Sequence, residues 1–158
     1  MSKQTLYKLM LLLHIIGTIM YVGGILSHII IANVLDQTDL NALVDTAIYK
    51  ERSAFILIVP GIALKTISGL VLLTKYKKKP LWLKVKLGLA AFLLINAIVF
   101  LTPMMSELTE LAKESRALGE ITPAYHAKEH WEKIVGMSNA LPLLLVLILG
   151  VIKPKRSN

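Results

Sequence analysis

The chain has 158 residues, no cysteine, 55% hydrophobic residues and a formal net charge of +8. Its mean hydropathy of +0.64 exceeds that of typical soluble domains, and the absence of cysteine excludes disulfides, thiolate metal sites and cysteine nucleophiles. We therefore expect an integral membrane protein, with its basic residues at a membrane rim and with no nucleic-acid binding.

Four apolar stretches are long enough to cross a bilayer as helices. A helix needs about 20 apolar residues to cross ~30 Å of hydrocarbon, and a lone span must satisfy its backbone hydrogen bonds internally. The predicted spans are residues 6–34, 54–74, 81–105 and 131–152. The sequence thus predicts an all-α fold, in which residues 1–158 form a single membrane domain built as a four-helix bundle.

Two longer segments, residues 36–53 and 106–130, join these spans on one side. Within residues 106–120, apolar side chains recur at roughly helical spacing among glutamates. This pattern predicts a short amphipathic helix lying on the bundle or on the membrane interface. We expect Thr122-Pro123 to separate it from the last span.

The charged residues divide sharply between the two sides of the predicted bundle. One side carries eleven basic residues and no acidic ones, from the first residues of the chain, the segment 75–86 and the tail 153–156. All ten acidic residues fall on the opposite side. The positive-inside rule places the purely basic side, with both chain ends, in the cytoplasm. We expect a multi-pass protein of the cell (inner) membrane, surrounded by lipid.

His14 and Lys86 are ionisable residues inside predicted spans, where such side chains are costly and often functional. Counting 1.5 Å per residue places both at a similar depth in the cytoplasmic half. An imidazole in an apolar bundle is a common haem ligand, and a lysine beside it could pair with a propionate or act as a base. The alternative is that His14 bonds to a neighbouring helix and that Lys86 extends to the rim.

Lys65 lies in the middle of the second predicted span, too far from either rim to reach water easily. We expect it to face the bundle interior, with Asn96 or Asn139 as partner. Lys65 and Lys86 are the candidate catalytic side chains, and a structural hydrogen bond is the alternative for Lys65.

Three further histidines lie toward the opposite side. His28 follows His14 by fourteen residues on nearly the same helix face, a spacing seen in di-haem cytochromes b. His126 and His130, with Glu129, could complete an outer haem site or bind zinc or copper. The alternative is a solvated helix start that carries surface histidines.

Short motifs along nearly the whole chain resemble the HemJ-type protoporphyrinogen oxidases and related CopD-like membrane proteins. They occur in residues 14–24, 52–70, 82–87 and 139–154. The resemblance implies a small four-helix protein that binds b-type haem, with His14 and Lys86 at matched positions and Asn139 in a matched motif. The sequence departs from the pattern at Tyr21, Ile29-Ile30 and Ala140. It is at least as similar to predicted integral membrane proteins of the same CopD-like grouping, whose activity the resemblance does not define.

These observations favour a haem b-binding membrane redox protein with His14 as axial ligand. It would oxidise a porphyrinogen or pass electrons from a membrane partner or quinone, because no soluble-cofactor motif is present. Two alternatives stay open: a copper or other cation transporter that uses His28, His126 and His130, and a non-catalytic membrane subunit. A homo-oligomer is compatible with each of them.

Overall fold

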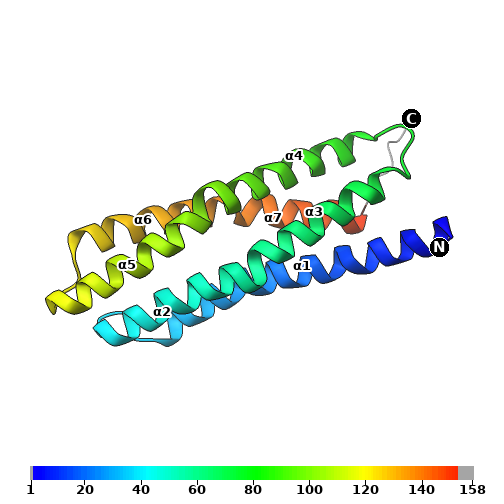
Figure 1. Cartoon of the computed structure of the whole chain (residues 1–158). Coiled ribbons are helices and arrows are strands. Elements are labelled where there is room, and N and C mark those ends of the chain that lie inside the picture. The colour runs from blue at the N-terminus through cyan, green and yellow to red at the C-terminus, as the bar shows by residue number, and fades with distance from the viewer. Residues whose placement is uncertain (1, 153–158) are drawn as a thin grey trace.

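The computed structural model describes residues 2–152, and this part of the chain is helical with no strand. Four helices are long and apolar enough to cross a membrane: Lys3–Val34, Leu40–Leu73, Leu81–Leu118 and Pro123–Ile152. They run side by side in alternating directions (Figure 1). The predicted all-α membrane bundle is therefore confirmed. Lys153, Lys155 and Arg156, which contributed to the charge argument, lie outside the described residues.

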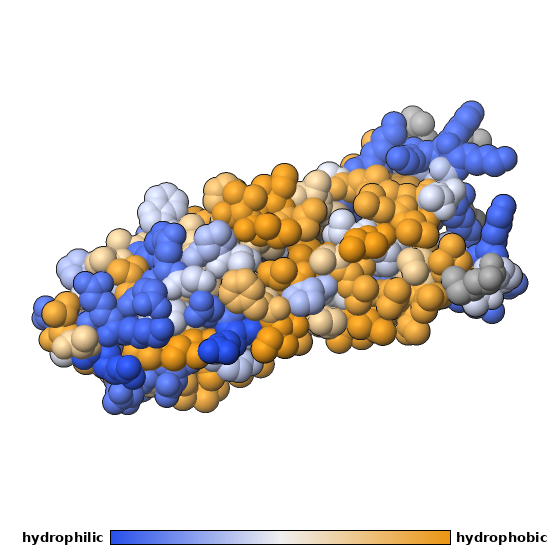
Figure 2. All heavy atoms as spheres, viewed as in Figure 1, coloured by the Kyte–Doolittle hydropathy of each residue, from blue (hydrophilic) through white to orange (hydrophobic). Residues whose placement is uncertain are grey.

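The two ends of the bundle differ in composition. We call the end that holds the start of α1 and the connection 74–80 the basic end, and the end that holds the connections 35–39 and 119–122 the acidic end. Between them an apolar belt covers the face seen in Figure 2, and hydrophilic residues gather at both ends. Large apolar side chains are exposed along all four long helices, as expected where lipid rather than water surrounds the helices.

Polar side chains cap the first turns of α1 and α2. In α1 (Lys3–Val34) the Ser2 side chain accepts a hydrogen bond from the Thr5 backbone, and Asp39 caps α2 (Leu40–Ser53) in the same way through Asn41. Such caps satisfy backbone N–H groups that have no partner within the helix.

The second and third long helices each contain a widened π-helical segment close to a proline. The segment η1 (Ala54–Ile58) precedes α3 (Val59–Leu73), whose second residue is Pro60. The segment η2 (Asn96–Leu101) lies between α4 (Leu81–Ile95) and α5 (Thr102–Leu118), and Pro103 follows it. Proline has no N–H to donate to the carbonyl four residues earlier, and the helix accommodates this loss with longer-range backbone bonds.

The acidic end is built by helices that extend beyond the apolar belt. The third long helix, Leu81–Leu118, has 38 residues. Its length of about 57 Å exceeds the ~30 Å thickness of the hydrocarbon layer. Residues 106–118 therefore belong to α5 and continue the third long helix, rather than forming a separate helix on the bundle surface. Gly119 ends α5 with a positive φ of 77°, a conformation that glycine adopts without steric cost.

The last helix has two parts, α6 (Pro123–Ser138) and α7 (Ala140–Ile152). Thr122 caps α6 by accepting a hydrogen bond from the Tyr125 backbone. The helical pattern is interrupted at Asn139, three residues before Pro142, which has no N–H to donate.

The four long helices associate as two antiparallel pairs. α1 packs extensively against α3, and α4 packs against α7. The pairs meet mainly at the acidic end, where α2 packs against α5. The apolar core of this contact consists of Leu43, Val44, Ala47, Ala54, Met105, Leu108, Ala112 and Tyr125. The arrangement leaves a cavity between the two pairs toward the acidic end.

Candidate functional site

His14 is held against α3 through one ring nitrogen. Its Nδ1 lies 2.8 Å from the Lys65 carbonyl oxygen and 3.3 Å from the Ser68 hydroxyl oxygen. A carbonyl oxygen can only accept, so Nδ1 carries the hydrogen and donates it. In the neutral ring, Nε2 then keeps a lone pair, and no hydrogen-bond partner for it is found among residues 2–152. His14 therefore presents one nitrogen that is free to ligate.

Gly69 makes room for this imidazole. A Cβ at Gly69 would lie 3.2 Å from His14 Cε1, closer than ordinary van der Waals contact. Any larger residue would push against the ring or displace α3. The position of the ring thus depends mainly on the backbone of α3, with the Ser68 hydroxyl as a second, longer contact.

Lys65 is buried at 7% exposure in the middle of α3. Its ammonium lies 5.2 Å from the centre of the Tyr21 ring, a distance at which a cation is attracted to the ring face. No carboxylate within the described part of the chain pairs with it. The predicted amide partners of Lys65 are wrong, because Asn96 donates to Asn139 at 2.6 Å and to Ser138 at 3.1 Å instead.

Lys86 approaches the same region from α4. Its Nζ lies beside Gly150 of α7, and its charge acts on both His14 and Lys65. We call His14, Lys65 and Lys86 the histidine–lysine site. The structure thus brings Lys65, from the middle of its span, together with His14 and Lys86, which the sequence places at a similar depth toward the basic end.

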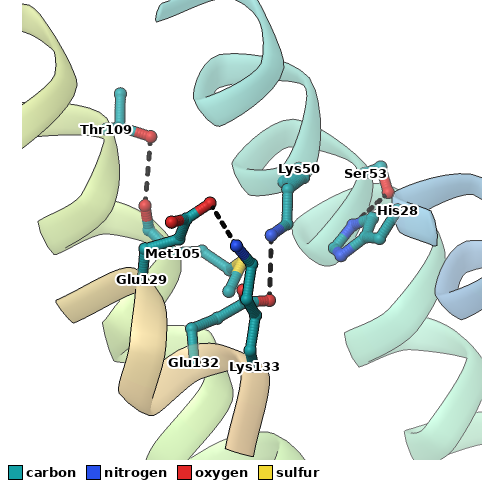
Figure 3. Close-up of polar contacts among 8 residues, drawn as sticks. All are labelled: His28, Lys50, Ser53, Met105, Thr109, Glu129, Glu132 and Lys133. Atoms are coloured by element: carbon teal, nitrogen blue, oxygen red, sulfur yellow. Dashed lines mark hydrogen bonds and ion pairs between the residues drawn. The ribbon is translucent and has the colours of Figure 1, made fainter. Parts of the chain in front are cut away.

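A partly open cavity of about 420 Å³ lies toward the acidic end, between the two helix pairs, and residues of all four long helices line it. His28 of α1 lies in its wall, with Nε2 at 2.7 Å from the Ser53 hydroxyl (Figure 3). Asn139 also lines this cavity. The structure therefore separates His28 and Asn139 from the histidine–lysine site.

An ion pair across the cavity joins the two helix pairs. Lys50 of α2 lies 2.9 Å from Glu132 of α6, with exposures of only 13% and 12% for the two side chains (Figure 3). Beside it, Glu129 pairs with Lys133 at 2.9 Å. This pair was not predicted from the sequence, although Glu132 is an acidic residue inside the predicted span 131–152, which is itself a signal of function or pairing.

Tyr21 lines the cavity, and its ring contacts Lys65. The residue is 1% exposed, and its hydroxyl has no hydrogen-bond partner among the described residues. Because a buried polar group without a partner is destabilising, this hydroxyl calls for an explanation. The sequence pattern singled out Tyr21 only as part of a motif.

The outer histidines do not join His28. His126 and His130 are exposed on α6, and they are absent from the cavity lining. Glu129, their expected companion, pairs with Lys133. Across residues 2–152, the structure shows no group of three or more histidine and carboxylate side chains that could hold a metal ion.

The chain matches a known protein family over nearly its whole length. A family model described as predicted integral membrane protein (DUF2269) matches residues 8–154. No curated protein and no solved structure matches significantly. The match covers every residue of the histidine–lysine site and of the cavity.

Proposed function

The chain belongs to the DUF2269 family of predicted integral membrane proteins, and we propose that it is a haem b-binding redox protein of the cell membrane. The observation that carries this proposal is the contact between His14 and the Lys65 carbonyl. Histidines that ligate metals almost always donate their second ring nitrogen to a carbonyl or carboxylate, which fixes the tautomer and the ring orientation. His14 is held in this way, with Nε2 available for iron.

The neighbouring residues fit the rest of such a group. Haem carries two propionates, and the site contains two ammonium groups, Lys65 and Lys86, whose charges interact with His14. Lys65 has no carboxylate partner within the described residues, so an anion from outside the chain would offset its burial. The surrounding helices are apolar, which suits a porphyrin ring.

Bound haem would supply one-electron redox chemistry that no amino-acid side chain provides. The chain's own residues would ligate the iron through His14, hold the propionates through Lys65 and Lys86, and exclude water. The resemblance to HemJ-type and CopD-like proteins adds two candidate activities, oxidation of a porphyrinogen and electron transfer. By the positive-inside rule, this site would lie in the cytoplasmic half of the membrane.

The test is a visible spectrum of the purified protein in mild detergent, after expression with ample haem, in oxidised and reduced forms. We expect a Soret band that is lost in His14→Ala and kept in His126→Ala, which removes an exposed histidine. Lys65→Met keeps the backbone carbonyl that holds His14, and we expect it to bind haem more weakly without losing the band. Size-exclusion profiles of each variant would verify folding.

Two results would overturn the proposal. Wild-type protein without a Soret band would refute haem binding, and so would a band that survives His14→Ala. A colourless protein with copper by elemental analysis would support cation handling instead. A colourless protein without metal would leave a membrane subunit with no chemistry of its own.

A further inference from the structure

The cavity toward the acidic end has the size and lining of a small-molecule site. Its volume of about 420 Å³ falls within the roughly 300–1,000 Å³ typical of ligand pockets. Most of its wall is apolar, and a few polar groups converge on it. The histidine–lysine site does not use this cavity, so its purpose needs a separate explanation.

Both π-helical segments border this cavity. Ala54 and Ile58 of η1 line one side, and Ala97 and Leu101 of η2 line another. Segments of this kind are rare, and they occur frequently at functional sites. The prolines that follow account for the widened backbone, and the widened turns of both helix pairs line this one cavity.

The charges in the cavity wall compensate one another. Lys50 pairs with Glu132 across the cavity, and Lys133 pairs with Glu129 along α6. Beside these ion pairs, the His28 imidazole is hydrogen-bonded to the Ser53 hydroxyl (Figure 3). Within residues 2–152, the wall therefore offers no unpaired ion to a charged ligand, and it favours a neutral molecule that carries hydrogen-bonding atoms.

Tyr21 brings an unpartnered polar group to the cavity. The residue belongs to the cavity wall, and its buried hydroxyl has no hydrogen-bond partner among the described residues. Tyr21 and His28 are seven residues apart on α1, so they lie on nearly the same face and about 10 Å apart along the helix axis. A ligand that accepts a hydrogen bond from Tyr21 and extends toward His28 would use both.

The rim of the cavity gives access from lipid. Ile29 of α1 and Met137 of α6 belong to its lining, and they are 56% and 76% exposed. Exposed apolar side chains on a membrane-spanning helix face the bilayer. A ligand with a long apolar tail could therefore place its head group in the cavity and leave its tail between these helices.

We propose that this cavity binds the head group of a membrane quinone. A quinone ring is neutral and carries carbonyl oxygens on opposite edges, so one can accept from the Tyr21 hydroxyl while the other faces the group around His28. The choice of a quinone over other neutral lipids rests on the proposed redox function, but the binding itself requires no haem. Lys65 of the histidine–lysine site also contacts the cavity wall, because its carbonyl holds His14 and its ammonium lies over Tyr21.

The experiment measures binding of a decyl-tailed quinone analogue to the purified full chain in lipid nanodiscs by calorimetry. We expect Tyr21→Phe to weaken binding about tenfold, in line with the loss of one well-made buried hydrogen bond. The matched control is Tyr7→Phe, which changes a tyrosine of the same helix whose ring contacts Lys75 near the basic end. This control should bind like the wild type.

A second measurement separates binding from folding. Without ligand, Tyr21→Phe should unfold at the same temperature as the wild type or higher, because it removes a buried hydroxyl that has no partner. Added quinone should raise the melting temperature less in Tyr21→Phe than in the wild type. These two effects have opposite signs, so a loss of affinity cannot reflect misfolding.

Other outcomes would overturn the inference. No binding of the quinone to the wild type would refute it, as would equal affinities of the wild type and Tyr21→Phe. Equally tight binding of decanoate or of a monoacylglycerol would make the cavity a general lipid site. His14→Ala distinguishes the two proposals, because it should lose haem and still bind the quinone.

Discussion

Gly17 of α1 is a position where one added methyl group should lower the stability of the bundle strongly. A Cβ added there would lie 2.6 Å from the Lys65 backbone nitrogen and 2.7 Å from the Gly61 carbonyl oxygen. Both neighbours are backbone atoms, so no side-chain rotation can relieve the clash. Ordinary contact begins near 3.4 Å, and α1 and α3 would have to separate by most of an ångström. Small residues allow this kind of close approach between membrane helices.

The expected cost follows from two opposing effects. Overpacking in a well-packed region costs about 1–3 kcal/mol, and a rigid backbone clash belongs at the upper end of that range. Alanine gains about 1 kcal/mol over glycine in helix propensity. We therefore expect Gly17→Ala to lower the free energy of unfolding by about 2 kcal/mol, from the difference of these figures.

Denaturant or thermal unfolding in mild detergent, followed by circular dichroism, would measure this change. Gly23→Ala is the matched control, because no atom lies within 4 Å of a Cβ there, and it should be neutral or slightly stabilising. Because the displaced backbone includes Lys65, whose carbonyl holds His14, Gly17→Ala should also weaken haem binding. Equal stability of the two variants would refute the packing described for α1 and α3.

Three further predictions concern contacts elsewhere in the chain. Lys50→Met should destabilise the protein by about 3 kcal/mol, because it leaves the nearly buried Glu132 without its cation; a Lys50→Met, Glu132→Met double variant should recover most of this loss in the same unfolding assay. Asn96→Leu should lower the free energy of unfolding by about 1 kcal/mol, because it removes the hydrogen bonds to Asn139 and Ser138. Asn33→Leu changes an exposed residue that is hydrogen-bonded only within its own helix, and it should leave the stability almost unchanged. In the connection 35–39, the Thr38 hydroxyl and backbone N–H donate to Asp36 and hold the pKa of its carboxyl below the ordinary value. The stabilisation from this contact is therefore present above the ordinary pKa and is lost as the pH falls through the lowered one. Thr38→Ala should raise the pKa of Asp36 toward its ordinary value in an NMR titration, and an unchanged titration would contradict this assignment.

The sequence predicts the fold well because lipid imposes simple rules. Long apolar stretches must be helical, and the one-sided distribution of lysines orders the ends, so the bundle and the shared depth of His14 and Lys86 follow from counting residues. The same rules fail at the acidic end. Outside the bilayer, residues 106–118 can lie on a surface or extend a helix, and the buried contact of Ala112 and Leu108 with α2 decides for extension.

The cavity could not be predicted in the same way. Lys50 and Glu132 lie more than eighty positions apart, and their pairing depends on how far α2 and α6 extend beyond the apolar belt. The unpartnered hydroxyl of Tyr21 is a property of the packed bundle that no sequence pattern reports. Of these residues, only Glu132 could be singled out from the sequence, because it is an acidic residue within a predicted span.

Lys65 connects the two proposed sites in terms of energy as well as position. A lysine in the middle of a membrane helix costs about 2.5–3.5 kcal/mol by insertion measurements. Its contact with the Tyr21 ring is worth up to about 2 kcal/mol when desolvated, so a net cost of about 1 kcal/mol or more is left in the protein alone. An anion bound from outside the chain, such as a haem propionate, would offset this remainder. Lys65→Met should therefore make the haem-free protein more stable while it weakens haem binding, and a lysine that serves only to pack the bundle would not produce these opposite effects.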